Sequence, residues 1–243
     1  AEKMKKGKER FVFRVHDQPD EEKLKNLQTV VKRLGYNLDL KKNNLNDSLN
    51  TLLENTFGKN EQNLIDTLMI RSMSKAEYTT KNIGHYGLAF DNYTHFTSPI
   101  RRYPDVLVHR LIEAELKNEK IKTEELETLC NHSTHMEILA TKAERDSIKL
   151  MQIKYMLDKE GKTFEAVISG VTARGVFVEV VENKCEGLVK AKDLPGDFYV
   201  HDEKNHQFVG EKTGKKYQLG DKTRVMLIKA DQVKRRLDFQ ILS

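Results

Sequence analysis

The chain has 243 residues, of which 33% are charged and 38% are hydrophobic, and its 42 basic and 37 acidic residues give a net charge of +5 at pH 7. These proportions are typical of a soluble globular protein with one large or two medium domains. No apolar run approaches the roughly 20 residues that a membrane-spanning helix needs, which excludes a protein of that kind. The basic excess suits a polyanionic partner without requiring one.

The two cysteines, Cys130 and Cys185, are far apart in the sequence and lack the spacing of metal ligands. We interpret them as free thiols rather than a disulfide, which predicts a reducing cytoplasmic location. The chain begins with Ala1 and the charged run AEKMKKGKER rather than with methionine. This beginning indicates a piece of a longer protein.

Up to about residue 160, hydrophobic residues recur with helical spacing. The stretch DEEKLKNLQTVVKRLG predicts a helix whose buried face includes Leu34 and which ends before Gly35. The stretch NDSLNTLLENTFG predicts a second helix, with Asn46 or Asp47 as its cap and Phe57 on its buried face. Further helices are predicted from Gln62 to Ala76, from Pro104 to Asn118 and from Thr123 to Asp158.

From Gly161 the pattern changes to the alternation of β-strands. The stretch KTFEAVISGVTARGVFVEVV is rich in β-branched residues, and shorter strands follow at EGLVKAKDL, TRVMLIKAD and RRLDFQIL. Five short strands in about 80 residues predict a small closed barrel. The fold class is therefore α+β, with a mainly helical domain over residues 1–160 and an all-β five-stranded barrel over residues 161–243.

An arginine pair stands between two prolines in the stretch HFTSPIRRYPD. Ser98 is a good N-cap and Pro99 suits the first helical position, so Arg101 and Arg102 are predicted in a first helical turn. Pro104 cannot complete a helical hydrogen bond, so we expect the backbone to turn again directly after the pair.

The position of the pair is consistent with two interpretations. A helix N-terminus disfavours cations unless an anion binds there, and free N–H groups and guanidinium groups then converge on one phosphate. Alternatively, one arginine pairs with Asp105 or Asp91 and the other faces solvent. The local residues alone do not choose between these two.

The longer stretch NIGHYGLAFDNYTHFTSPIRRYPDVLVHRLI resembles the signature of the ribonuclease II/ribonuclease R (RNB) family of processive 3′→5′ exoribonucleases. FVFRVHDQPDEEKL before it and AERD at 143–146 extend the resemblance over most of the chain, and bacterial members are the most similar. The resemblance implies hydrolysis of single-stranded RNA to nucleoside 5′-monophosphates. A non-catalytic module or adaptor that binds single-stranded RNA is the alternative function.

The resemblance also implies roles for individual residues. Arg101 matches a catalytic arginine that contacts the phosphate at the scissile bond, where it stabilises transition-state charge. Arg102, His85, His95 and Glu144 are RNA-binding candidates. For each histidine the alternative is hydrogen-bonded packing, and for Glu144 it is a solvated helix acid paired with a lysine or arginine one turn away.

In the family, an aspartate cluster that holds Mg²⁺ lies in the first half of the catalytic domain, before the part that this chain matches. The chain therefore resembles the C-terminal half of such an enzyme, with its Mg²⁺ ligands outside the chain and no metal or cofactor expected within it. The expected partners are single-stranded RNA and the missing N-terminal half of the catalytic domain. No membrane partner is expected, and we predict a monomer.

The barrel sequence resembles the OB-fold of the ribosomal S1 class, which binds single strands on aromatic platforms edged with positive charge. Phe164 and Phe177 match exposed aromatic residues of that class, with core packing as the alternative. Arg174 stands where an aromatic residue is frequent, and Lys190 where histidine is frequent. The insert PGDFYVHDEKNHQFVGEKTGKKYQLGD predicts a hairpin beside the RNA face.

Strand alternation from Val176 to Val180 predicts which side of the barrel binds RNA. The three valines point to one side and Phe177 to the other, so the valine side is the better candidate for the core. We expect one outer face to carry the RNA-binding residues. These are Phe164, Phe177, Arg174, Lys190, and Arg235 or Arg236.

Overall fold

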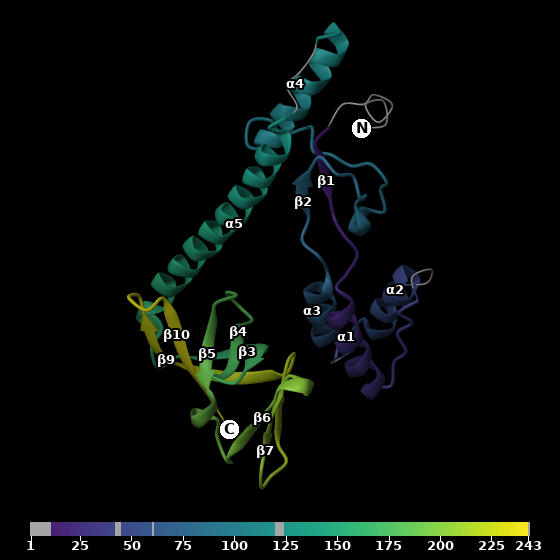
Figure 1. Ribbon diagram of the computed structural model, residues 1–243. Helices are drawn as coiled ribbons and strands as arrows, with labels where there is room; N and C mark the ends of the chain where they lie inside the picture. The colour runs from purple at the N-terminus through teal and green to yellow at the C-terminus, as the bar shows by residue number, and fades with distance from the viewer. Residues whose placement is uncertain (1–10, 42–44, 60, 120–123, 243) are drawn as a thin grey trace. The chain divides into compact units, whose positions relative to one another are not determined.

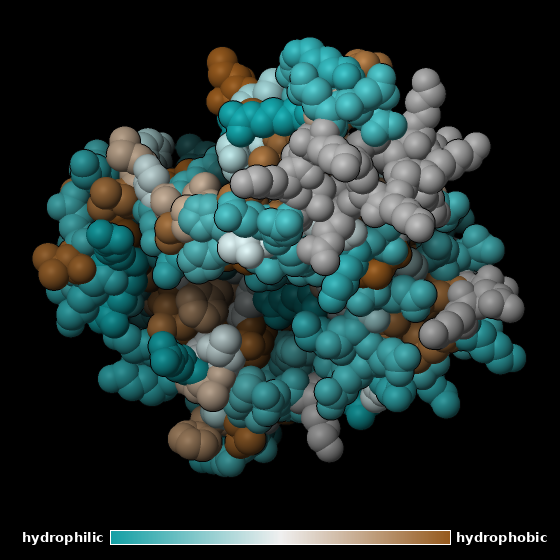
Figure 2. Space-filling view, turned by 45° about the horizontal axis from the view of Figure 1, so that its top comes forward, coloured by the Kyte–Doolittle hydropathy of each residue, from teal (hydrophilic) through white to brown (hydrophobic). Residues whose placement is uncertain are grey.

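The computed structural model describes residues 11–41, 45–59, 61–119 and 124–242, which form two compact units (Figure 1). The first unit combines residues up to Glu21 with Ser72–Ala143, and the second combines Glu22–Arg71 with Glu144–Ser243. Among the described residues, every helix is too short or too polar to span a lipid bilayer. The face shown in Figure 2 is mostly hydrophilic, with hydrophobic residues in small separate groups.

The first unit is built around a short antiparallel sheet and two helices. Phe13 lies opposite Thr79 in the sheet, and the buried residues Val108 and Cys130 belong to the same core as the strands. The elements are β1 (Phe13–Val15), β2 (Glu77–Thr79), α4 (Tyr103–Lys117) and the first part of α5 (Leu126–Met156).

An arginine joins the sheet of this unit to α5. Arg14 donates from Nη1 and Nη2 to the two carboxylate oxygens of Glu137, at 2.6 and 2.9 Å. The Arg14 guanidinium also lies 4.6 Å from the centroid of the Tyr78 ring. A two-pronged bond of this kind fixes orientation as well as distance, so β1, β2 and α5 hold one geometry.

Three helices open the second unit, and their buried faces follow the predicted spacing. Leu24, Leu27 and Ile65 are almost completely buried, at 4%, 1% and 0% exposure. The helices are α1 (Glu21–Arg33), α2 (Leu45–Thr56) and α3 (Gln62–Ser72).

The ends of these helices differ from the sequence prediction. Leu34 and Phe57 are 42% and 78% exposed, because α1 ends at Arg33 and α2 at Thr56 before either side chain reaches the core. Asn46 and Asp47 lie inside α2 rather than at its cap, and α3 stops at Ser72 instead of Ala76. Gly35 follows the end of α1, as predicted, and Gly58 follows the end of α2, and both have positive φ.

The C-terminal part of the second unit contains the predicted closed barrel. Its strand order is β10-β5-β4-β3-β9, in which β10 and β5 are parallel and the other pairs are antiparallel. The strands are β3 (Thr163–Thr172), β4 (Gly175–Val180), β5 (Glu186–Lys190), β9 (Lys222–Asp231) and β10 (Arg236–Ile241).

The barrel core continues into the last turns of α5. Ile153 and Met156, at 1% and 0% exposure, belong to the same buried cluster as the barrel strands. Gly161 then donates its backbone N–H to the Leu227 carbonyl at 2.8 Å, so the connection after α5 is tied to β9. The domain boundary at residue 160 stays a prediction.

Two glycines allow the strands of the barrel to come close together. A Cβ at Gly175, where φ is +145°, would lie 2.0 Å from the Val189 carbonyl oxygen, and one at Gly187 would lie 2.5 Å from the Leu237 oxygen. Any larger residue at either position would force the backbone apart. The barrel therefore needs glycine at both.

The insert between β5 and β9 is a three-stranded antiparallel sheet, larger than the predicted hairpin. Phe208 is 2% exposed and joins the buried cluster of the barrel together with Tyr199 and Tyr217. The strands are β6 (Tyr199–Asp202), β7 (Gln207–Gly210) and β8 (Lys216–Gln218).

Candidate nucleic-acid interface

The backbone around the arginine pair differs from the predicted helix start. Arg101 and Arg102 both donate their backbone N–H groups to the Ser98 carbonyl, at 3.3 and 3.1 Å, which closes a turn. α4 begins only at Tyr103, with Arg102 in the N-cap position. The predicted cap at Ser98 is therefore wrong, because Pro104 lies in the first turn of α4, where a missing N–H costs nothing.

The two arginines have different environments. Arg102 donates from Nη2 to Asp105 Oδ2 at 3.0 Å, and Asp105, at 0% exposure, also accepts the Ser98 backbone N–H at 2.7 Å. Arg101 is exposed, and its guanidinium has no ion pair or hydrogen bond with the described part of the chain. Arg102 thus forms the ion pair with Asp105 that the second interpretation predicts. The Arg101 guanidinium is free to bind an anion.

His85 and His95 belong to a cluster of rings in the first unit. The Tyr93 ring centroid lies 5.1 Å from that of His85 and 5.7 Å from that of His95. His95 Nδ1 lies 2.8 Å from Tyr78 Oη, and the His85 ring stacks on His16 at 5.2 Å. Both histidines are packed and partly exposed, but only His95 has the hydrogen bond of the alternative interpretation, because His85 Nδ1 is buried without a partner among the described residues.

The two imidazoles favour the neutral form. Burial, with His16 next in importance, lowers the pKa of His85, and burial together with the charge of Arg102 lowers the pKa of His95. Neutral rings can stack or exchange hydrogen bonds with RNA but add no positive charge. Their RNA-binding role stays a prediction.

Glu144 is an exposed residue in the middle of α5, with no hydrogen bond or ion pair to the described residues. The same stretch of helix exposes large apolar side chains, with Leu139 at 52%, Ile148 at 53% and Met151 at 60%. Glu144 is therefore solvated, as its alternative interpretation holds, but the pairing with a lysine or arginine one turn away is not present among the described residues. A role in RNA binding is untested.

The alternation predicted for β4 is confirmed. Val176, Val178 and Val180 are each 0% exposed, while Phe177 is partly exposed on the opposite side. The register places Phe177 beside Gly170 on β3 and beside Leu188 on β5. The Phe177 side chain lies close to Gly170, since a Cβ at Gly170 would lie 3.5 Å from Phe177 Cβ and 3.6 Å from Cδ2.

Several cations lie on the strands and turns around this ring. Lys190 pairs with Gly175 in the register, and the Arg174 carbonyl accepts the Ala191 backbone N–H at 3.0 Å, so Arg174 and Lys190 lie at the same end. Arg236 shares the carboxylate of Asp238 with Lys190. Arg235 is exposed in the turn before β10, in a left-handed conformation.

Phe164 does not share the outer face with Phe177. It lies opposite Val225, which is 0% exposed, and it packs against the barrel core. The physical reason is strand alternation, because Phe164 has the same parity on β3 as the buried residues Ala166 and Ile168. The sequence prediction of one shared face is wrong for this residue.

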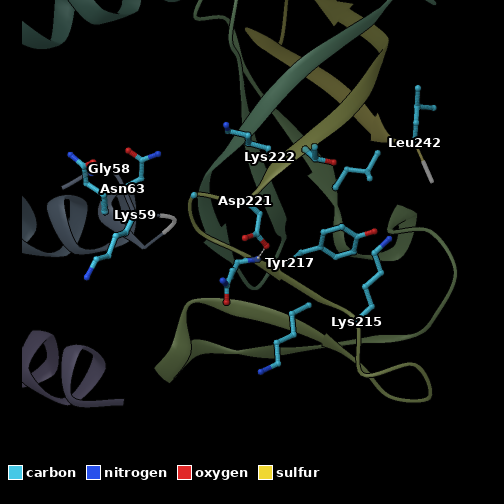
Figure 3. Close-up of a pocket in the computed structure, with 14 residues that line it drawn as sticks. Gly58, Lys59, Asn63, Lys215, Tyr217, Asp221, Lys222 and Leu242 are labelled. Carbon is cyan, nitrogen blue, oxygen red and sulfur yellow. Dashed lines mark hydrogen bonds between the residues drawn. The ribbon is translucent and has the colours of Figure 1, made fainter. Parts of the chain in front are cut away.

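The second unit also holds an electropositive cavity of about 580 Å³ that sequence reasoning missed (Figure 3). Burial raises the pKa of Asp221, which accepts the Gln218 backbone N–H at 2.9 Å. The lysines that line the cavity all lie on exposed turns and strand ends, where the sequence gives no periodic signal. They are Lys59, Lys215, Lys216 and Lys222.

Side chains that bind metals are not clustered in the described part of the chain. No group of three or more histidine, cysteine, aspartate or glutamate side chains in that part of the chain comes close enough to hold a metal.

The barrel, its aromatic and cationic outer face and the arginine motif define a class of RNA-binding proteins in which an RNB domain is followed by an S1 domain. Residues 1–118 match the RNB domain, and residues 157–242 match the S1 RNA binding domain. The chain belongs to the RNB family, and in it an S1 domain follows the RNB domain.

Similar proteins carry the name ribonuclease R. The chain is 41% identical to Ribonuclease R of Aquifex aeolicus over 95% of its own length and 33% of that protein. It is 34% identical to Ribonuclease R of Escherichia coli, over 99% of the chain and 31% of that protein. Mycoplasma genitalium RNase R in complex with ribose methylated single-stranded RNA has a TM-score of 0.89 at 27% identity, covering 100% of this chain and 39% of that one.

The chain spans about a third of the length of the curated relatives it matches, 33% of the protein from A. aeolicus and 31% of that from E. coli. The RNB and S1 matches therefore concern only this part of those proteins.

Proposed function

We propose that the chain is the part of a 3′→5′ exoribonuclease that holds single-stranded RNA while it is hydrolysed to nucleoside 5′-monophosphates. The outer face of the S1 barrel carries this proposal, because Phe177 lies there on the same surface as Asp238, which Lys190 and Arg236 both approach. Single strands stack their bases on such rings and place their phosphates beside the cations. The M. genitalium RNase R complex with single-stranded RNA supports the proposal.

Arg101 is the residue that the proposal assigns to the scissile phosphate. Its neighbour Arg102 is held by the buried carboxylate of Asp105, while the Arg101 guanidinium is exposed and open to an anion. A guanidinium donates two parallel hydrogen bonds to phosphate oxygens and stabilises the charge that develops there. This is electrostatic stabilisation at a fixed point rather than proton transfer, because arginine remains protonated.

The rest of the catalytic domain is the proposed protein partner of this chain. The middle of α5 supports this, because its exposed leucine, isoleucine and methionine side chains are of a type normally buried. The ligands for Mg²⁺ are expected in that remaining part.

A non-catalytic module that binds single-stranded RNA is the second candidate. The observation in its favour is the lack of a metal-binding carboxylate cluster among the described residues. The barrel face serves RNA binding equally in both proposals, so the difference between them concerns hydrolysis alone.

Arg101→Ala in the complete enzyme tests the catalytic assignment. We expect the rate of single-turnover cleavage to fall by the equivalent of about 2–4 kcal/mol, because one well-placed donor to the transition state is lost. RNA affinity, measured by fluorescence anisotropy, should change little, because most phosphate contacts lie elsewhere along the strand. Arg110→Ala, which removes an exposed arginine from α4, is the matched control. A variant that binds RNA poorly but cleaves bound RNA at the normal rate contradicts the assignment.

A further inference from the structure

The outer surface of the barrel carries a row of neighbouring residues, one from each strand. The register places Gly170 beside Phe177, Phe177 beside Leu188, Leu188 beside Asp238, and Asp238 beside Lys229. Paired residues in neighbouring strands point to the same side of a sheet. Asp238 therefore lies on the same surface as the Phe177 ring.

The carboxylate of Asp238 is buried without a hydrogen bond. The residue is 8% exposed, and its Oδ2 lies 3.4 Å from Arg236 Nη2 and 3.7 Å from Lys190 Nζ. The two cations offset the negative charge of the carboxylate, but neither forms a hydrogen bond with it in this geometry. Oδ1 is buried and has no partner among the described residues. Because buried carboxylates are almost always supplied with donors, this one has the capacity to accept a hydrogen bond from a ligand.

Asp238 also lines a cavity of about 450 Å³ on this surface. Leu188, Ile228 and Phe239 contribute apolar walls, and Lys190 and Lys229 contribute the cations. A cavity of this size suits one small group of a larger ligand, held by apolar contact and oriented by a few polar atoms. A phosphate group is a poor occupant next to the carboxylate, whereas a neutral group with a hydrogen-bond donor fits it.

We propose that Asp238 accepts a hydrogen bond from a neutral donor of a bound nucleotide, either the ribose 2′-hydroxyl or an exocyclic amino group of the base, and thereby makes the barrel selective among nucleotides. The inference rests on the proposed RNA binding of the barrel. The 2′-hydroxyl distinguishes RNA from DNA, and the amino group distinguishes adenine and cytosine from uracil. Lys190 and Arg236 offset the charge of the acceptor and remain available to the neighbouring phosphates.

The test measures the affinity of the 243-residue chain for oligo(rA), oligo(rU) and oligo(dA) of equal length at fixed salt. Asp238→Leu removes the acceptor, and Asp238→Asn keeps a weaker, neutral one. Glu186→Gln is the matched control, because it removes one carboxylate charge from an exposed position on β5. The readout is the ratio of the association constant for oligo(rA) to that for oligo(dA) or oligo(rU), which does not depend on the folded fraction of a variant.

We expect Asp238→Leu to reduce one ratio by about tenfold, as for the loss of a hydrogen bond to a charged group. Asp238→Asn should reduce the same ratio by less, and Glu186→Gln should leave it unchanged. A change in the ratio of oligo(rA) to oligo(dA) assigns the 2′-hydroxyl, and a change in that of oligo(rA) to oligo(rU) assigns the amino group. Unchanged ratios in a chain that binds RNA overturn the inference alone, whereas a wild-type chain that binds none of the three overturns the proposed RNA binding as well.

Discussion

Phe164 and Phe177 show how strand position decides the role of one residue type. Both belong to the barrel, but Phe164 packs against the core opposite the buried Val225, and Phe177 lies on the outer surface beside Leu188. The same mutation at the two positions therefore removes different interactions. Mutations of Phe177 and Phe164 can therefore be used to measure RNA stacking and barrel stability separately.

Phe177→Ala should weaken the binding of a short single-stranded RNA by about 1–3 kcal/mol for the base that stacks there. Thermal unfolding should change little, because the side chain packs on the surface and the valine core stays intact. Phe164→Ala should do the reverse, lowering the unfolding temperature through a cavity next to the core while folded protein keeps its RNA affinity. Anisotropy and circular dichroism measure the two effects. Similar behaviour of the two variants contradicts the assignment of faces.

Single residues were the least predictable feature of the site. The alternation of three valines around Phe177 was enough to predict its face, since all four lie on one regular strand. Phe164 stands on a strand with a β-bulge between Ile168 and Gly170, so its face relative to Phe177 could not be obtained by counting residues. Asp238 was missed because its pairing with Leu188 joins two strands that are distant in the sequence.

The turn between β7 and β8 depends on one carboxylate. Asp197 accepts hydrogen bonds from the backbone N–H groups of Lys212 and Thr213, at 2.9 and 2.7 Å, and from the Thr213 hydroxyl at 2.7 Å. The bonds from Thr213 are the main cause that lowers the pKa of Asp197 to about 2. The hydrogen bonds that hold this turn therefore favour the ionised carboxylate of Asp197.

The amide protons of Lys212 and Thr213 should report this dependence. Because the folded pKa lies below the ordinary value of about 3.9, the stabilisation is complete above that pH and is lost as the pH falls through about 2. Hydrogen exchange measured by NMR should show protected amides above this window and faster exchange, relative to the intrinsic rate, below it. Asp197→Asn should lose protection at neutral pH, whereas Asp193→Asn, at an exposed position, should not. Titration of the Asp197 carboxyl near its ordinary pKa contradicts the prediction.

Whole elements were predictable where a periodic pattern was long. The five barrel strands and the buried faces of α1 and α3 follow the spacing of apolar residues. The ends of the helices could not be predicted in this way. Leu34 and Phe57 continue the apolar spacing, but each follows the last helical residue and lies outside the core. The start of α4 was misplaced for a similar reason, since Ser98 and Pro104 both suit a helix start and only the fold selects one.

At the scale of the molecule, the two cysteines lie in separate cores. Cys130 is buried in the first unit and Cys185 in the barrel, and both are free thiols, as the sequence predicts. Burial raises the pKa of Cys130 to about 12. Each unit therefore has its own hydrophobic core, and all the strands that carry the proposed RNA-binding face belong to the barrel of the second unit.

The 243-residue chain by itself should bind single-stranded RNA and leave it intact. The barrel face is complete within the chain, while the described residues contain no cluster of side chains that could hold a metal ion. Affinity should fall steeply between low and physiological salt, because lysine and arginine contacts to single strands release counterions. Anisotropy at two salt concentrations measures binding, and a denaturing gel of end-labelled RNA incubated with Mg²⁺ measures hydrolysis. Stepwise shortening from the 3′ end that Arg101→Ala abolishes contradicts the second half of the prediction. RNA that stays unbound at low salt contradicts the first.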